Sequence, residues 1–91
     1  MSTLYFRTYD LGFHGTRHSA AHGFASYDIY EDADGAITIR IVSGGYELFA
    51  QALPIGVATV EFAKSLVGEY VKNGLVSTLL GRKAAEQYAA A

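Results

Sequence analysis

Three histidines stand four residues apart, at positions 14, 18 and 22, and they are the only histidines in the 91-residue chain. Imidazole binds metals and changes its charge near neutral pH. If this segment is helical, His18 and His22 lie about 6 Å apart along the axis and could chelate one metal. His14 and His22 would then be about 12 Å apart, too far to share a metal whose bonds to nitrogen are about 2 Å long. We therefore predict no metal site and no cofactor.

The simplest interpretation of His14, Arg17, His18 and His22 is a partly exposed polar segment. An alternative is a contact or pH-sensitive role. In their protonated, cationic form the three imidazoles could face an anionic partner or the acidic residues of segment 28–34. A metal- or pH-responsive regulator built on His18 and His22 therefore stays open as a hypothesis.

The acidic segment 28–34 invites a calcium-loop interpretation, which fails on spacing. With Gly35 at the sixth position of an EF-hand loop, Tyr30 takes the first position and Ile41 the twelfth, where a bidentate glutamate is required. The chain also has no phosphate-loop motif, no Gly-x-Ser-x-Gly nucleophile elbow and no cysteine. A chain this small leaves little room for both a core and a shaped pocket. We predict that it is not an enzyme.

The composition is that of one small folded domain, which we place over residues 1–91. Apolar residues make up 51% of the chain, enough for one modest core. The formal net charge of −2 disfavours nucleic acid as a partner. The longest uncharged stretch, residues 48–60, is shorter than the about 20 residues of a membrane helix. With no cysteine and no visible signal peptide, we expect a cytoplasmic protein without a membrane partner.

Alternating and β-favouring residues predict a small antiparallel sheet. Residues 3–9 are expected to form one strand. Asp34-Gly35 lies between the β-rich runs 27–30 and 36–42 and is typical of a hairpin turn. Ser43-Gly44-Gly45 predicts a second turn, into a strand that ends at Pro54. Within this sheet the period of two places Ile37, Ile39 and Ile41 together on the face that turns toward the core.

The remaining segments have helical signals. Thr16 and Gly23 could cap and close a two-turn helix around the histidines, and an irregular loop is the alternative. Residues 57–72 carry an apolar stripe at helical spacing, Asn73-Gly74 is a helix stop, and a second helix is expected over residues 75–91. The predicted fold is α+β: a small antiparallel sheet of about four strands with two C-terminal helices packed on one face.

Seven tyrosines are the most informative feature of the composition. If the isoleucines face the helices, Thr38 and Arg40 face away from them. We expect five residues on that far side of the sheet to bind a partner: Tyr5, Arg7, Tyr9, Tyr30 and Arg40. Tyrosine and arginine are enriched at protein interfaces, although tyrosine is also simply a good strand residue.

These features favour a non-enzymatic protein–protein interaction module, a small inhibitor or regulator that binds a larger protein or protein complex. Size and composition alone are those of phage-type inhibitors, anti-CRISPR proteins among them, and of small bacterial regulators. Self-association through the sheet face or edge, giving a homodimer, is a further possibility. The alternative from another class is a nucleic-acid-binding or antitoxin-like transcriptional regulator, since tyrosines on an open sheet can stack bases.

Overall fold

A computed structural model describes the backbone of residues 4–56 and 58–90 and the side chains as far as Glu86. Its elements are β1 (Arg7–Asp10), the short 3-10 helix η1 (Gly12–His14), β2 (Thr16–His22), β3 (Ala25–Glu31), β4 (Ile37–Ser43), β5 (Tyr46–Leu53), α1 (Val60–Lys72) and α2 (Leu75–Ala90). The predicted α+β class, an antiparallel sheet followed by two C-terminal helices, is confirmed. The sheet has five strands instead of about four.

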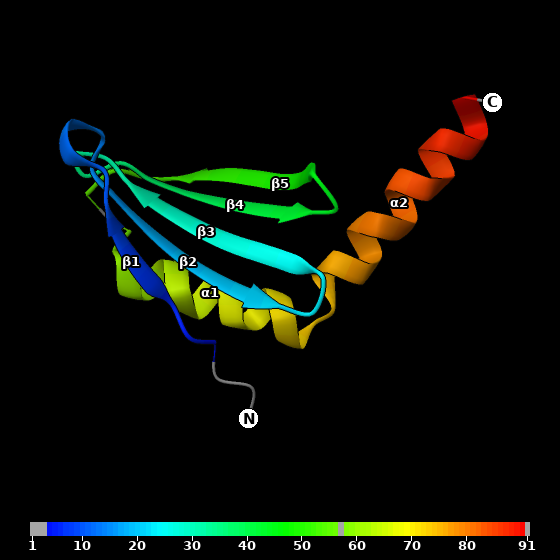
Figure 1. Cartoon of the computed structure of the whole chain (residues 1–91), viewed down its shortest axis with the longest axis horizontal. Coiled ribbons are helices and arrows are strands. Elements are labelled where there is room, and N and C mark those ends of the chain that lie inside the picture. The colour runs from blue at the N-terminus through cyan, green and yellow to red at the C-terminus, as the bar shows by residue number, and fades with distance from the viewer. Residues whose placement is uncertain (1–3, 57, 91) are drawn as a thin grey trace.

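The five strands form an antiparallel meander in chain order, so each strand pairs with the next along the sequence (Figure 1). The predicted hairpin turn at Asp34-Gly35 joins β3 to β4. Gly35 has a φ of 90°, which glycine adopts without strain, and the Asp32 N–H donates to the Ala36 carbonyl at 2.8 Å. The second predicted turn, at Gly44-Gly45, joins β4 to β5. Of the first predicted strand, residues 7–9 are in β1, residues 4–6 precede it without strand pairing, and Thr3 lies outside the described residues.

The histidine segment is a strand, and the predicted short helix or loop is wrong. β2 pairs with β1 over residues 16–19 and with β3 over its whole length. A two-turn helix is marginal by itself, whereas a strand between two neighbours makes ladder hydrogen bonds along both edges. Tight turns at Gly15 and Gly23, both at positive φ, set the ends of this strand.

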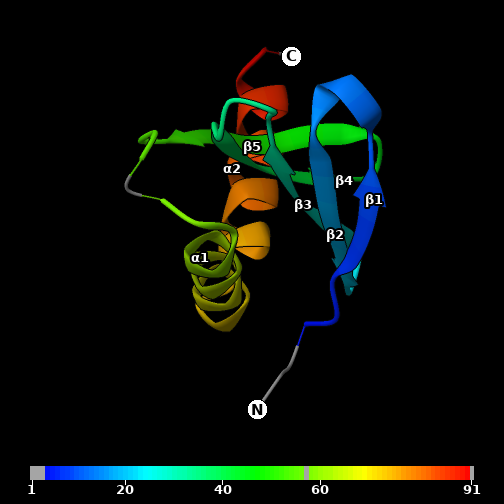
Figure 2. The same ribbon diagram turned by 90° about the vertical axis from the view of Figure 1, so that its left-hand side faces the viewer.

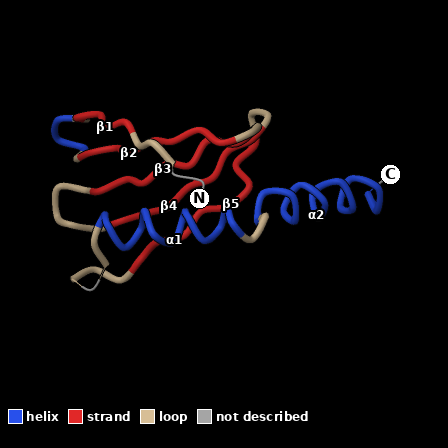
Figure 3. Tube along the Cα trace, turned by 90° about the horizontal axis from the view of Figure 1, so that it is seen from below, coloured by secondary structure: helices blue, strands red, loops and turns tan. Residues whose placement is uncertain are grey.

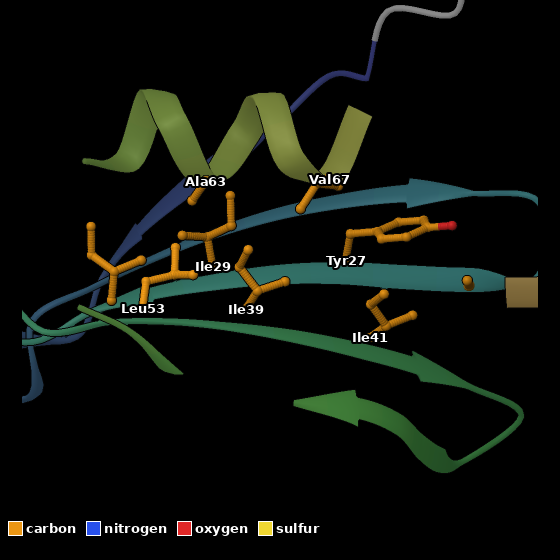
Figure 4. Packing of buried hydrophobic residues seen from close by; sticks show 9 residues of the cluster. Tyr27, Ile29, Ile39, Ile41, Leu53, Ala63 and Val67 are labelled. Carbon is orange, nitrogen blue, oxygen red and sulfur yellow. The ribbon is translucent and has the colours of Figure 1, made fainter. Parts of the chain in front are cut away.

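The core lies between the sheet and α1, on the side of the sheet that we call the helix face. Ile37, Ile39 and Ile41 are at most 2% exposed, as predicted from their alternation. In Figure 4, Ile29, Ile39 and Ile41 rise from β3 and β4 on the side that faces Ala63 and Val67 of α1, and both α1 residues are fully buried. Small residues at these two positions let α1 approach the sheet closely.

The two helices relate to the sheet in different ways. Thr59 caps the N-terminus of α1, because its hydroxyl accepts a hydrogen bond from the Phe62 N–H at 3.1 Å. The helix lies on the concave side of the curved sheet (Figure 2). Phe62, one of the residues that form the apolar stripe at helical spacing, is 52% exposed, whereas Ala63 and Val67 of the same stripe are fully buried. Viewed from below, α2 extends past the end of the sheet (Figure 3), and Leu75 and Val76 in its first turn pack against the core. Across the described residues, neither helix is long and apolar enough to cross a membrane.

Candidate interaction surface

The convex side of the sheet, opposite α1, carries the predicted tyrosines and arginines. We call it the open face, because nothing in residues 4–56 and 58–90 packs across it (Figure 2). Two neighbouring cross-strand rows form its centre, about 7 Å apart along the strands. One row is Tyr9, Arg17, Tyr30 and Thr38. The next row is Arg7, Ser19, Asp28 and Arg40.

A buried carboxylate organises the first half of this surface. Asp28 is only 4% exposed although it points to the uncovered side. Arg17 donates from Nε and Nη2 to the same oxygen, Asp28 Oδ1, at 3.3 and 3.2 Å, and the Ser26 hydroxyl lies 3.5 Å from that oxygen. The Arg17 guanidinium also lies over the Tyr9 ring, 5.5 Å from its centroid. Arg17 is therefore held by a charged partner and an aromatic partner at once, with its side chain still 37% exposed.

A second ion pair lies across the sheet from the first. Arg40 is the cross-strand neighbour of Asp28, and its Nε lies 3.2 Å from Glu47 Oε1. That N–H is not directed at the carboxylate well enough to make a hydrogen bond. Both side chains are more than 40% exposed, so solvent screens the pair and its contribution to stability is about 0–1 kcal/mol. Its effect is to orient the Arg40 guanidinium on the surface.

The structure brings four of the five predicted partner-binding residues together: Arg7, Tyr9, Tyr30 and Arg40 lie in the two central rows. Tyr5 precedes β1 and is 79% exposed, outside the strand ladder. Arg17, predicted as part of a histidine contact segment, belongs to the centre of the open face instead. Alternation within residues 16–22 would have placed Arg17 beside Tyr9 if the segment had been interpreted as a strand.

The histidines do not form one site. His14 is exposed in η1, while His18 and His22 lie on the helix face of β2, about 13 Å apart at strand spacing. Nδ1 of His18 lies 3.1 Å from the Thr8 hydroxyl, and its Nε2 is buried without a hydrogen-bond partner. No three metal-ligating side chains meet anywhere in the part of the chain that the structure describes. A shared metal between His18 and His22 is therefore excluded by distance.

Among the residues that the structure describes, grooves border the helices at several places, and we describe three of them. The first, about 630 Å³, lies between β2–β4 and the start of α1, and its lining includes His18, Glu31 and Lys64. The second, about 590 Å³, follows β5 and is lined largely by Phe49, Tyr70 and their neighbours. The third, about 240 Å³, separates the β2–β3 turn from α2. The first two are open to solvent, and the third is partly enclosed.

No family model, no curated protein and no solved structure matches the chain. The chemistry of its own surface is therefore the basis for proposing a function.

Proposed function

We propose that this chain is a non-enzymatic protein–protein interaction module, a small inhibitor or regulator that binds a larger protein through its open face. The observation that carries the proposal is the cluster of Tyr9, Arg17 and Asp28 at the centre of an uncovered sheet. Aromatic and arginine side chains contribute most of the binding energy at protein interfaces, usually near the centre of the contact. We place the interaction in the cytoplasm, because a chain without cysteine suits a reducing compartment.

The open face is preorganised for binding. Five backbone strands fix the positions of the side chains, and the Asp28 and Tyr9 contacts restrain Arg17. Ordering a flexible side chain at an interface costs about 0.5–1.5 kcal/mol, and Arg17 has already lost much of that freedom. An ordinary solvated sheet face needs neither a buried carboxylate nor a stacked guanidinium, so these features favour an interface over a merely wet surface.

The charge of the open face indicates the chemistry of the partner. Its two central rows contain three arginines, Arg7, Arg17 and Arg40, and one acid, Asp28, which pairs with Arg17. Arg40 pairs with Glu47 of β5 on the same face, so three positive and two negative charges leave one net positive charge there, on a chain whose net charge is −2. We expect the partner to present carboxylates and backbone carbonyls to it. Association should therefore be faster at low ionic strength.

Site-specific photo-crosslinking tests the proposal while the partner is still unidentified. The photoreactive residue p-benzoylphenylalanine replaces Tyr30 on the open face or, as a matched control, Glu69 on the exposed side of α1. In lysate of the native host we expect one discrete adduct from position 30 and none from position 69. Mass spectrometry then identifies the partner. Equal labelling from the two positions, or labelling from position 69 alone, would rule out the open face.

Binding measurements with the identified partner provide the second stage. Alanine replaces each of Tyr5, Arg7, Tyr9, Arg17, Tyr30 and Arg40 in turn. We expect Tyr9→Ala and Arg17→Ala to raise Kd at least about tenfold, corresponding to about 1.4 kcal/mol, and Glu69→Ala to leave it unchanged. Circular dichroism checks that each variant folds. Normal binding by all six folded variants would contradict the proposal, and tight binding to random oligonucleotides instead would favour a nucleic-acid regulator.

A further inference from the structure

The two edges of the sheet differ in how they are protected against further strand pairing. β1 is four residues long, fully exposed, and contains both Arg7 and Asp10. Short, charged edges of this kind discourage pairing with another strand. β5, at the other edge, is eight residues long, and its outer side has no strand partner among the described residues. Its second part, the last five residues 49–53, contains no charged residue and no proline.

Structural features confine any pairing along this edge to the second part of β5. The register between β4 and β5 shifts between Ile41 and Val42, so a bulge interrupts the first part of the strand. Tyr46, the first residue of β5, is also contacted by α2: Lys83 lies over its ring, 5.7 Å from the ring centroid. Pro54 follows β5 directly and ends the ladder. The regular, accessible segment is therefore residues 49–53, with Gln51 at its middle.

We infer that two copies of this chain pair through antiparallel β5 edges centred on Gln51, giving one continuous ten-stranded sheet. This proposal does not rest on the function of the open face. A two-fold axis perpendicular to the sheet keeps each side chain on the same face in both copies. Residues that pair across antiparallel strands share a face, so one residue of β5 must pair with the same residue of the second copy. With Gln51 in that position, Phe49 faces the second copy's Leu53 and Ala50 faces its Ala52. The register matches apolar with apolar and small with small, and it brings no two like charges together.

The groove beside β5 favours a second strand at this edge. It has a volume of about 590 Å³ and lies on the helix face, where Phe49 packs edge-on against Tyr70 with ring centroids 5.5 Å apart. The Tyr70 hydroxyl donates to Gln51 Oε1 at 2.8 Å, which fixes the central side chain of the edge. Among the described residues, those that line this groove are all uncharged. A strand added at the edge would cover the exposed part of these half-buried aromatic rings with its own uncharged helix-face residues.

A charge-patterning experiment tests both the dimer and its register. Ala50 and Ala52 are exposed and lie on the open face. In the proposed pairing, Ala50→Glu/Ala52→Glu sets glutamate opposite glutamate twice. The matched variant Ala50→Glu/Ala52→Lys sets glutamate opposite lysine twice and shares the same first substitution. Light scattering over a concentration series reports the mass of each protein, and circular dichroism confirms that each is folded.

We expect the wild-type chain and Ala50→Glu/Ala52→Lys to reach twice the mass of one chain, with Ala50→Glu/Ala52→Glu at least tenfold weaker in self-association. A micromolar Kd would give mostly dimer at about 200 µM, so a wild-type chain that is still monomeric at that concentration would overturn the dimer. The β5 edge would then be available to pair with a strand of another protein. Dimers of both variants would place the contact on another surface. Loss of the dimer in both variants would overturn the register centred on Gln51.

Discussion

Asp28 shows how a single residue turns a sheet face into an organised surface. Its carboxylate is almost inaccessible, yet only the side chains around it cover it, because no described helix or strand packs on that side. A buried charge is tolerated when it is paired and hydrogen-bonded. Arg17 supplies both interactions and in doing so fixes its own position over Tyr9. The burial of one acid therefore determines where an interface-type arginine is presented.

Gly15 is the glycine whose replacement should be most damaging. It has a φ of 96°, and a Cβ at this position would collide with the Glu31 carbonyl oxygen of the neighbouring strand. Gly15→Ala should therefore lower the free energy of unfolding by about 2 kcal/mol or more, since backbone strain adds to a clash with backbone atoms. Gly68→Ala is the control: it lies in α1 at an ordinary helical φ with open space around it, and alanine should stabilise by about 0.5–1 kcal/mol. Urea denaturation measures both. Equal effects of the same sign would refute this account of Gly15.

Tyr27 predicts how stability depends on alkaline pH. Burial raises the pKa of its phenol above the ordinary value of about 10. The folded chain then retains a proton that the unfolded chain loses. The contribution of this proton to the free energy of unfolding is fully present below about pH 10, the pKa of the unfolded chain. It is lost as pH rises through the folded-state pKa. Tyr27→Phe keeps the ring in the core and removes this ionisation, so its melting temperature should fall less steeply with pH above that point. Parallel pH profiles for the two proteins would show that Tyr27 does not contribute.

At the scale of elements, the sequence predicts turns and strongly patterned segments well. The Asp34-Gly35 hairpin, the strand ending before Pro54 and the isoleucine face of β4 all depend on local chemistry, and each is confirmed. β2 could not be recognised in the same way. Its residues TRHSAAH have no apolar alternation, and alanine and histidine do not favour strands. Pairing with β1 and β3 determines its conformation, and that information is not local.

Because β2 is a strand, a β-branched substitution at an exposed position should stabilise it, whereas the same substitution would destabilise a helix. Ala21 is exposed on the open face of β2. Ala21→Thr should raise the free energy of unfolding by up to about 1 kcal/mol, because β-branched residues favour strands and disfavour helices. Ser77 is exposed in α2, and Ser77→Thr should leave stability unchanged or lower it slightly. Chemical denaturation of the two variants distinguishes these cases. A destabilised Ala21→Thr protein would argue against the strand.

At the scale of the whole molecule, the inferred dimer and the open face reinforce each other. A two-fold axis perpendicular to the sheet leaves both open faces on the same side of a ten-stranded surface. Two copies of the Tyr9–Arg17–Asp28 cluster would then face a partner together. A partner with two matching sites would be held by both, which raises the overall affinity without any new contact. A small chain could in this way cover a large surface on a protein complex.

The same dimer links thermal stability to chain concentration. If unfolding separates the two copies, raising the concentration favours the folded dimer by mass action. For a chain of this size, a tenfold increase should raise the melting temperature by about 3 °C. The Ala50→Glu/Ala52→Glu protein should show no such rise over the concentrations at which light scattering finds it monomeric, while Ala50→Glu/Ala52→Lys should follow the wild-type trend. Differential scanning calorimetry at several concentrations provides the comparison. A wild-type melting temperature independent of concentration would mean that the β5 edge does not contribute to the stability of the fold.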